Sequence, residues 1–299
     1  MTDFYFVIQF RIMNTKEKKY EPGIALENTK KLSLCAIAFA GFSAVMPKEN
    51  SKRFKADVRD AKDLGLRIPY IHAAFSKEVD QLWAEGSAKK KHISDLIKTI
   101  KFCGKEGIKT MVMHPVSGDP VTRPNAPCKE GFESFTELLK AASDENVKIA
   151  LENVAGGTKH LEFLLDNIDS YYLDFCWDTG HNRHYDKDMD FMKKYGDRLG
   201  AVHISDTNST WKPGQDHTFD AHLLPWDGDI DFEDVGAKIA ESTYSGPVML
   251  ETIKHHKSGR LGKYDDMSAE SFLKTAYNRA KMLSNFTTSK HKEVYNGKK

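Results

Sequence analysis

The sequence predicts an α/β protein folded as a single (β/α)₈ barrel, and three observations lead to this class. Short apolar runs alternate with longer amphipathic stretches along all 299 residues. Several runs are apolar over four to six consecutive residues, as expected for parallel strands that are covered on both sides. No Pro-, Gly- or Ser-rich linker interrupts the alternation, and α/β barrels commonly reach this length undivided. We expect one domain over residues 1–299, with a flexible tail from about residue 286 because the end is rich in lysine.

Eight apolar runs are expected to form the strands of the barrel. They are Phe4–Phe10, Phe42–Met46, Leu66–His72, Lys109–His114, Val147–Glu152, Tyr172–Asp178, Gly200–Ile204 and Pro247–Glu251. Between them, the spacing of apolar residues predicts helices such as Ser94–Gly104 and Glu133–Ser143. Glycines just before four strands are expected to end the preceding helices: Gly65, Gly107, Gly200 and Gly246. An open doubly wound sheet is the alternative, but no G-x-G-x-x-G motif follows the first run.

The charge balance and the apolar runs restrict the classes of partner. The chain has 44 Lys and Arg against 43 Asp and Glu, which gives no general attraction to nucleic acid or to an anionic membrane. The four cysteines lie far apart without a C-x-x-C pair, as is typical of reduced thiols in the cytosol. The most apolar run covers only residues 32–42, well short of the roughly 18 residues that cross a bilayer. We expect a cytoplasmic protein without a membrane partner.

Six consecutive predicted strands end in, or reach, a histidine or an acidic residue. These residues are His72, His114, Glu152, Asp178, His203 and Glu251. In a barrel the carboxyl ends of the strands meet at one rim, where active sites are built. One such residue is commonly structural or caps the next helix, but six buried together would repel one another without a shared counter-ion. The pattern predicts bound divalent metal, and His, Asp and Glu ligands suit zinc or manganese.

Two short motifs add further potential ligands. Asp178 and His181 form a D-x-x-H pair at the end of the sixth predicted strand. Asp220 and His222 form a D-x-H pair in the long loop after the seventh. Together, His181, Asp220 and His222 supply the residues of an additional metal site.

Seven stretches, taken in order, resemble the xylose-isomerase-like TIM barrel superfamily. They are IHAAF, MVMHP, ALENVAGG, CWDTGH, VHISD, DAHLLPWDGDIDF and VMLET, and they span His72 to Glu251, about 60% of the chain. This superfamily joins sugar and sugar-phosphate isomerases and epimerases to the endonuclease IV family of abasic-site nucleases. The ordered set is specific, whereas no single stretch is diagnostic.

The resemblance implies particular ligand sets. The metal shared by the epimerases would be held by Glu152, Asp178, His203 and Glu251. In the nuclease family, Glu152 would bridge to a second ion on His72 and His114, and a third ion would take His181, Asp220 and His222. We therefore expect between one and three divalent ions.

The activity expected first is a metal-dependent isomerase or epimerase that acts on a sugar or sugar phosphate through an enediolate. Glu152 and Glu251 would act as base and acid from the two faces of the substrate, and His181 would hydrogen-bond a substrate oxygen. Ser209 stands where ketose 3-epimerases carry an arginine, and the run ending at Met46 lacks the glutamate frequent in this group, so a free-ketose 3-epimerase is disfavoured.

Two other activities remain open. One is an abasic-site nuclease with up to three zinc ions, the only case in which nucleic acid would be a partner. The other is a metal-dependent lyase or dehydratase on a sugar derivative. The sequence also leaves open whether the chain forms a homo-oligomer.

Overall fold

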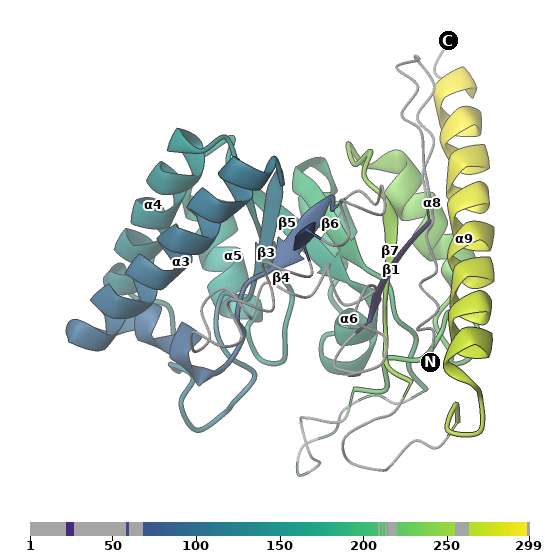
Figure 1. Cartoon of the computed structure of the whole chain (residues 1–299), viewed down its shortest axis with the longest axis horizontal. Helices are drawn as coiled ribbons and strands as arrows, with labels where there is room; N and C mark the ends of the chain where they lie inside the picture. The colour runs from purple at the N-terminus through teal and green to yellow at the C-terminus, as the bar shows by residue number, and fades with distance from the viewer. Residues whose placement is uncertain are drawn as a thin grey trace.

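A computed structural model describes residues 22–26, 58–59, 68–208, 210, 212, 214, 220–254 and 263–297. Parallel strands lie inside and helices lie outside (Figure 1). Two of the expected strands, Phe4–Phe10 and Phe42–Met46, lie outside the described residues, as does Gly65.

The described strands follow one another around a curled parallel sheet. The order β2-β3-β4-β5-β6 is continuous, and β1 pairs with β7. Ile204, directly after β6, joins the two parts: its N–H donates to Met249 O at 2.8 Å, and its carbonyl accepts from Glu251 N at 2.8 Å. Every strand from β2 to β7 therefore lies beside the next one in the sequence, as in a (β/α)₈ barrel.

Six predicted strands are present, each with slightly different ends. They are β2 (Tyr70–His72), β3 (Thr110–Met113), β4 (Lys148–Glu152), β5 (Leu173–Asp178), β6 (Leu199–His203) and β7 (Val248–Thr252). Nearly all their residues are buried, which explains why they read as continuous apolar runs. The sequence did not predict β1 (Pro22–Leu26), because a short segment that opens with Pro-Gly reads as a turn.

Helices alternate with these strands, and two short 3₁₀ segments, η2 and η3, accompany them. The elements are η2 (Lys77–Trp83), α3 (Ser87–Glu106), α4 (Lys129–Asp144), α5 (Thr158–Asn167), α6 (Thr179–Tyr185), α7 (Phe191–Tyr195), η3 (Gly196–Arg198), α8 (Phe232–Glu241) and α9 (Ala269–Gly297). The two predicted helices, Ser94–Gly104 and Glu133–Ser143, lie within α3 and α4.

Only one of the described glycines expected to cap a helix does so. Gly107 ends α3 with φ at 74°, the left-handed conformation that favours glycine. Gly200 instead lies inside β6, where a Cβ would come within 2.4 Å of the Asp174 carboxylate. Gly246 follows the end of α8, which is capped by Ser242. The cap predictions at Gly200 and Gly246 were therefore wrong, because a glycine before a strand can also serve close packing.

The interior of the barrel has two layers, and the second layer positions the candidate site. One inward residue from each strand from β2 to β7 forms a small cluster of its own: Tyr70, Val112, Ala150, Cys176, Ala201 and Met249. Side chains alternate between the two faces of a strand, so the next inward position is two residues further on. Those positions are His72, His114, Glu152, Asp178, His203 and Glu251. The larger apolar core packs between the strands and the outer helices.

Helix α9 continues through the region for which the sequence predicts a flexible tail. It runs to Gly297 along the edge of the molecule, beside α8 and β1 (Figure 1). Thr287 is fully buried, Phe286 packs on Gly236, and a ring nitrogen of His291 lies 2.9 Å from Ala240 O. Within the described part of the chain, no helix combines the length and the apolarity that a membrane span requires.

Truncation tests the role of the last turns of α9. Removal of every residue after Asn285 takes away Phe286, Thr287 and His291, so we expect a loss of about 2 kcal/mol in the free energy of unfolding, measured with urea. A chain ending at Val294 keeps these contacts and serves as the control. Equal stability of the two truncated chains and the full chain would show that the segment behaves as a tail.

Candidate metal centre

Four side chains predicted to converge do so at the carboxyl ends of the strands. Glu152, Asp178, His203 and Glu251, here called the central group, each offer a ligand atom, and these atoms lie within 4.8 Å of one another. His203 Nδ1 lies 2.7 Å from Glu251 Oε2 and 3.2 Å from Glu152 Oε1. The four residues are at most 8% exposed. The central group is therefore a compact, buried set of oxygen and nitrogen donors.

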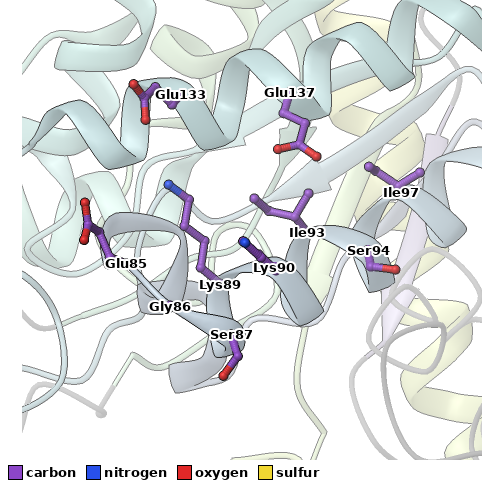
Figure 2. Close-up of a pocket in the computed structure, with 10 residues that line it drawn as sticks. All are labelled: Glu85, Gly86, Ser87, Lys89, Lys90, Ile93, Ser94, Ile97, Glu133 and Glu137. Carbon is purple, nitrogen blue, oxygen red and sulfur yellow. The ribbon is translucent and has the colours of Figure 1, made fainter.

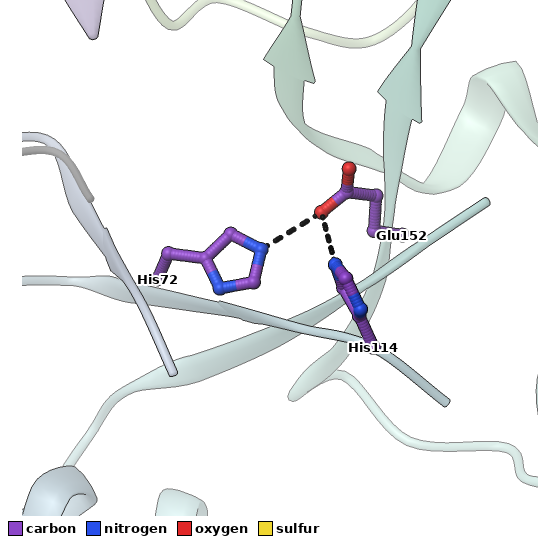
Figure 3. A group of neighbouring side chains, drawn as sticks. All are labelled: His72, His114 and Glu152. Carbon is purple, nitrogen blue, oxygen red and sulfur yellow. Dashed lines mark hydrogen bonds and ion pairs between the residues drawn. The ribbon is translucent and has the colours of Figure 1, made fainter. Parts of the chain in front are cut away.

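Two histidines approach the other oxygen of Glu152. His72 Nε2 lies 2.9 Å and His114 Nε2 lies 3.4 Å from Glu152 Oε2 (Figure 3). These three residues, the paired-histidine group, also meet the spacing needed to hold one ion. Glu152 thus presents Oε1 to the central group and Oε2 to the paired-histidine group, as a bridging carboxylate would.

The third set, the loop group, consists of His181, Asp220 and His222. His181 lies in the first turn of α6, whose N-terminus is capped by Asp178 Oδ1 accepting from His181 N at 2.6 Å. His181 Nε2 and His222 Nε2 lie 3.5 and 3.8 Å from Asp220 Oδ2. His222 has a φ of 41°, unusual for a residue other than glycine, and its carbonyl accepts from Ile253 N just after β7.

Three of the histidines are oriented by backbone carbonyls. The Nδ1 atoms of His72, His181 and His222 lie 2.6, 2.9 and 3.2 Å from the carbonyl oxygens of Ala73, Asn153 and Glu251. Because a carbonyl only accepts, each Nδ1 carries a proton and each Nε2 is turned toward a carboxylate. Metal-binding histidines are oriented in this way, which fixes the ring and the free nitrogen.

Burial and close charges shift the pKa values of these groups in opposite directions. Burial raises the pKa of Glu152, yet His203, His114 and His181 hold it well below its usual range. At Glu251, burial also raises the pKa, but the positive charge of His203 outweighs this effect, and the pKa is lowered to about 2. Burial, with the negative charges around it, raises the pKa of Asp178 to about 8.

The buried carboxylate of Asp178 leaves one oxygen without a protein partner. Its Oδ2 accepts no hydrogen bond from the part of the chain that the structure describes. A divalent ion would satisfy this oxygen and offset the repulsion among the three carboxylates of the central group. The donor set of oxygen and imidazole nitrogen fits zinc or manganese.

Two further residues, which no sequence motif indicates, lie beside these groups. Cys176, two residues before Asp178, places its sulfur within 4.8 Å of donor atoms of Glu152 and His203, and burial raises its pKa to about 12. In the sequence it stands only as one of four separate cysteines without a C-x-x-C partner, which does not indicate a metal ligand. Asn153 directly follows Glu152 and is fully buried, yet a polar residue after a strand resembles an ordinary loop residue.

Two of the surface hollows in the described part of the chain lie away from the three groups, which together comprise nine candidate ligands. One, of about 850 Å³, lies between α3 and α4, with Lys89 and Lys90 on one side and Glu133 and Glu137 on the other (Figure 2). The other, of about 400 Å³, is lined by Lys148 and residues near the amino ends of the strands. In barrel enzymes, the amino ends of the strands serve stability rather than chemistry.

A barrel with such a ring of side chains at its strand ends has the architecture of a TIM-barrel enzyme. The family model described as xylose isomerase-like TIM barrel matches residues 30–275. The chain belongs to this family, and the predicted fold class is confirmed.

Curated relatives and a solved structure support this assignment. The chain is 26% identical over 262 residues to an inosose dehydratase of Clostridium botulinum (strain Alaska E43 / Type E3), covering 77% of this chain and 84% of that protein. It is 27% identical over 274 residues to an uncharacterized protein of Sinorhizobium fredii (strain NBRC 101917 / NGR234), covering 80% and 84%. The crystal structure of a D-tagatose 3-epimerase-like protein matches with a TM-score of 0.60 and 18% identity, covering 91% and 90%.

The pKa shifts predict how the chain responds to pH after a chelator has removed bound ions. Folded Asp178 keeps its proton to about pH 8, whereas the unfolded carboxyl loses it near pH 3.8, so ionisation favours the unfolded state. Burial opposes protonation of His222, but Asp220 raises its pKa to about 9. The stabilising charge of His222 is therefore lost as the pH rises through 9. We expect the free energy of unfolding to fall by more than about 1 kcal/mol between pH 7 and 9.

The variant Asp178→Asn is the matched control for this pH dependence. Its neutral amide resembles the protonated carboxyl, so its free energy of unfolding should fall less over the same range. Urea unfolding at pH 7 and at pH 9 measures how far the free energy of unfolding falls in wild type and in the variant. A wild-type stability that stays constant or rises would contradict the assigned direction.

Proposed function

We propose that the protein is a divalent-metal-dependent enzyme that removes a proton beside a carbonyl group of a small sugar or sugar derivative, sugar phosphates included. The class expected first is an isomerase or epimerase. The observation that carries this proposal is the orientation of His72, His181 and His222, whose Nδ1 atoms bond to carbonyls while their Nε2 atoms face carboxylates.

The residues that would hold metal are those of the three groups. Glu152, Asp178, His203 and Glu251 would hold the ion shared with the epimerases, which when bound polarises oxygens of the substrate. His72 and His114 would hold a second ion together with Glu152, and His181, Asp220 and His222 a third. Zinc and manganese both suit these donors.

Proton transfer is assigned to two carboxylates of the central group. Glu152 Oε1 and Glu251 Oε2 lie 3.2 and 2.7 Å from His203 Nδ1, and both groups have lowered pKa values, so both are ionised and able to accept a proton. We assign one as the base that takes the proton beside the carbonyl. The other first gains a proton from solvent and then returns it to the substrate, while the first releases its proton to solvent. Where the loop group holds no ion, His181 Nε2, which lies 3.5 Å from Asp220 Oδ2, would hydrogen-bond the substrate oxygen.

A dehydratase is the second candidate, favoured by the inosose dehydratase relative at 26% identity. Its first step is the same removal of a proton beside a ketone. The electron pair of the broken C–H bond then forms a C=C bond, and the hydroxyl on the next carbon leaves with a proton as water. Where the loop group holds no ion, we assign His181 to donate that proton through Nε2.

Metal content tests the ligand assignment. We expect the purified chain to retain at least one divalent ion, by elemental analysis, and Glu152→Gln to bind ions far more weakly because an amide is a poorer ligand than a carboxylate. Glu152 serves two groups, so its variant should lose more ions than His222→Ala, which changes only the loop group. A Glu152→Gln chain with wild-type metal content and activity would remove this residue from the centre.

Hydrogen exchange with solvent tests the reaction. In deuterated water, a ketose substrate should gain deuterium beside its carbonyl, and a chelator should stop the exchange. An inosose that exchanges and also loses water, seen by mass, would identify the dehydratase. The control is a duplex with an abasic site, since the three groups resemble those of the nuclease family. Chelator-sensitive cutting of this duplex without exchange on any sugar would overturn the proposal.

A further inference from the structure

Asn153 extends the pairing between two strands beyond their last backbone pair. The ladder between β4 and β5 ends at Glu152 and Cys176. Beyond it, Asn153 Nδ2 donates to Asp178 O at 2.9 Å, and Asn153 Oδ1 accepts from Asp178 N at 2.8 Å. The side-chain amide thus takes the place of a peptide group and fixes the backbone of Asp178.

The backbone of the same residue holds a second candidate ligand. Asn153 O accepts from His181 Nδ1 at 2.9 Å, which directs His181 Nε2 to within 3.5 Å of Asp220 Oδ2. Asp178 Oδ1 in turn accepts from His181 N at 2.6 Å. Asp178 and His181 are therefore tied to each other and to Asn153.

These contacts link two of the three groups. Asn153 follows Glu152 directly, bonds to Asp178 of the central group and orients His181 of the loop group. It is fully buried, so its amide has no water to replace a lost partner. We propose that Asn153 is a positioning residue that sets the central group and the loop group in register for metal binding. This inference rests on the proposed metal-dependent function.

Two substitutions test the proposal through metal affinity. Asn153→Ala removes both side-chain hydrogen bonds, and we expect the affinity for Zn²⁺ or Mn²⁺, measured by competition with a chromophoric chelator, to fall about 10- to 100-fold. Asn153→Asp keeps the shape but cannot donate to Asp178 O. The added negative charge alone would strengthen cation binding, whereas a positioning role predicts weaker binding, so the sign of the change decides.

A neighbouring asparagine provides the matched control. Asn182 accepts from Trp177 Nε1 at 3.0 Å and donates to Asp186 O and Met189 O at 2.9 and 3.0 Å. These partners lie outside the nine candidate ligands. Asn182→Ala should therefore lower stability while leaving metal affinity at the wild-type value.

A second measurement keeps the test separate from the proposed function. In chain stripped of ions, the Asp178 and His181 amides should exchange hydrogen faster in Asn153→Ala than in wild type or Asn182→Ala, because both belong to the network of Asn153. A wild-type chain that binds no ion would refute the proposed function, and the hydrogen exchange would then still show whether Asn153 holds Asp178 and His181 in place. Unchanged affinity and exchange in the Asn153 variants, or an equal loss of affinity in Asn182→Ala, would overturn the positioning role.

Discussion

The carboxylate of Glu152 is the interaction on which the rest of the site depends. It is buried at the end of β4, and each oxygen faces a different set of imidazoles: His72 and His114 on one side, His181 and His203 on the other. An ionised carboxylate in such a place is tolerated only with positive partners. His181 and His203, whose pKa values are raised, provide this positive charge, and they help to hold the pKa of Glu152 low against the effect of burial.

The loop group has a different structural basis from the central group. The residues of the central group stand at the ends of strands, where pairing with neighbouring strands fixes their position along the barrel axis. The loop group instead depends on the first turn of α6 and on a loop held by hydrogen bonds to β7 and to Asp206. Backbone in a loop is generally less constrained than backbone in a sheet, so these side chains need the additional contacts that the structure provides.

The inner part of the barrel could be predicted well from the sequence because two simple features mark it, the apolar runs and the residues that end them. Continuous apolar runs identified β2 to β7, and the residues at or beside their carboxyl ends were correctly expected to lie together at one rim. The short strand β1 was missed because pairing with β7, a contact distant in sequence, stabilises a segment whose local pattern is that of a turn. Similarly, the lysines after residue 286 predicted a flexible tail. In the structure the chain continues there as helix α9, and Thr287 is buried against neighbouring elements. The role of Asn153 depends on hydrogen bonds to Asp178 and His181, which no periodicity in the sequence reveals.

The two inner layers of the barrel also limit how a protein with this architecture can change by insertion and deletion. One residue added inside β4 would turn Glu152 from the interior to the helix-facing side, and the same holds for the other strands from β2 to β7. An insertion or deletion of two residues would turn Glu152 back to the interior but would shift it by one layer along the barrel axis. Length variation among related chains is therefore expected to accumulate in the segments between strands, where new loops can alter substrate choice while the ring of strand-end residues keeps its place.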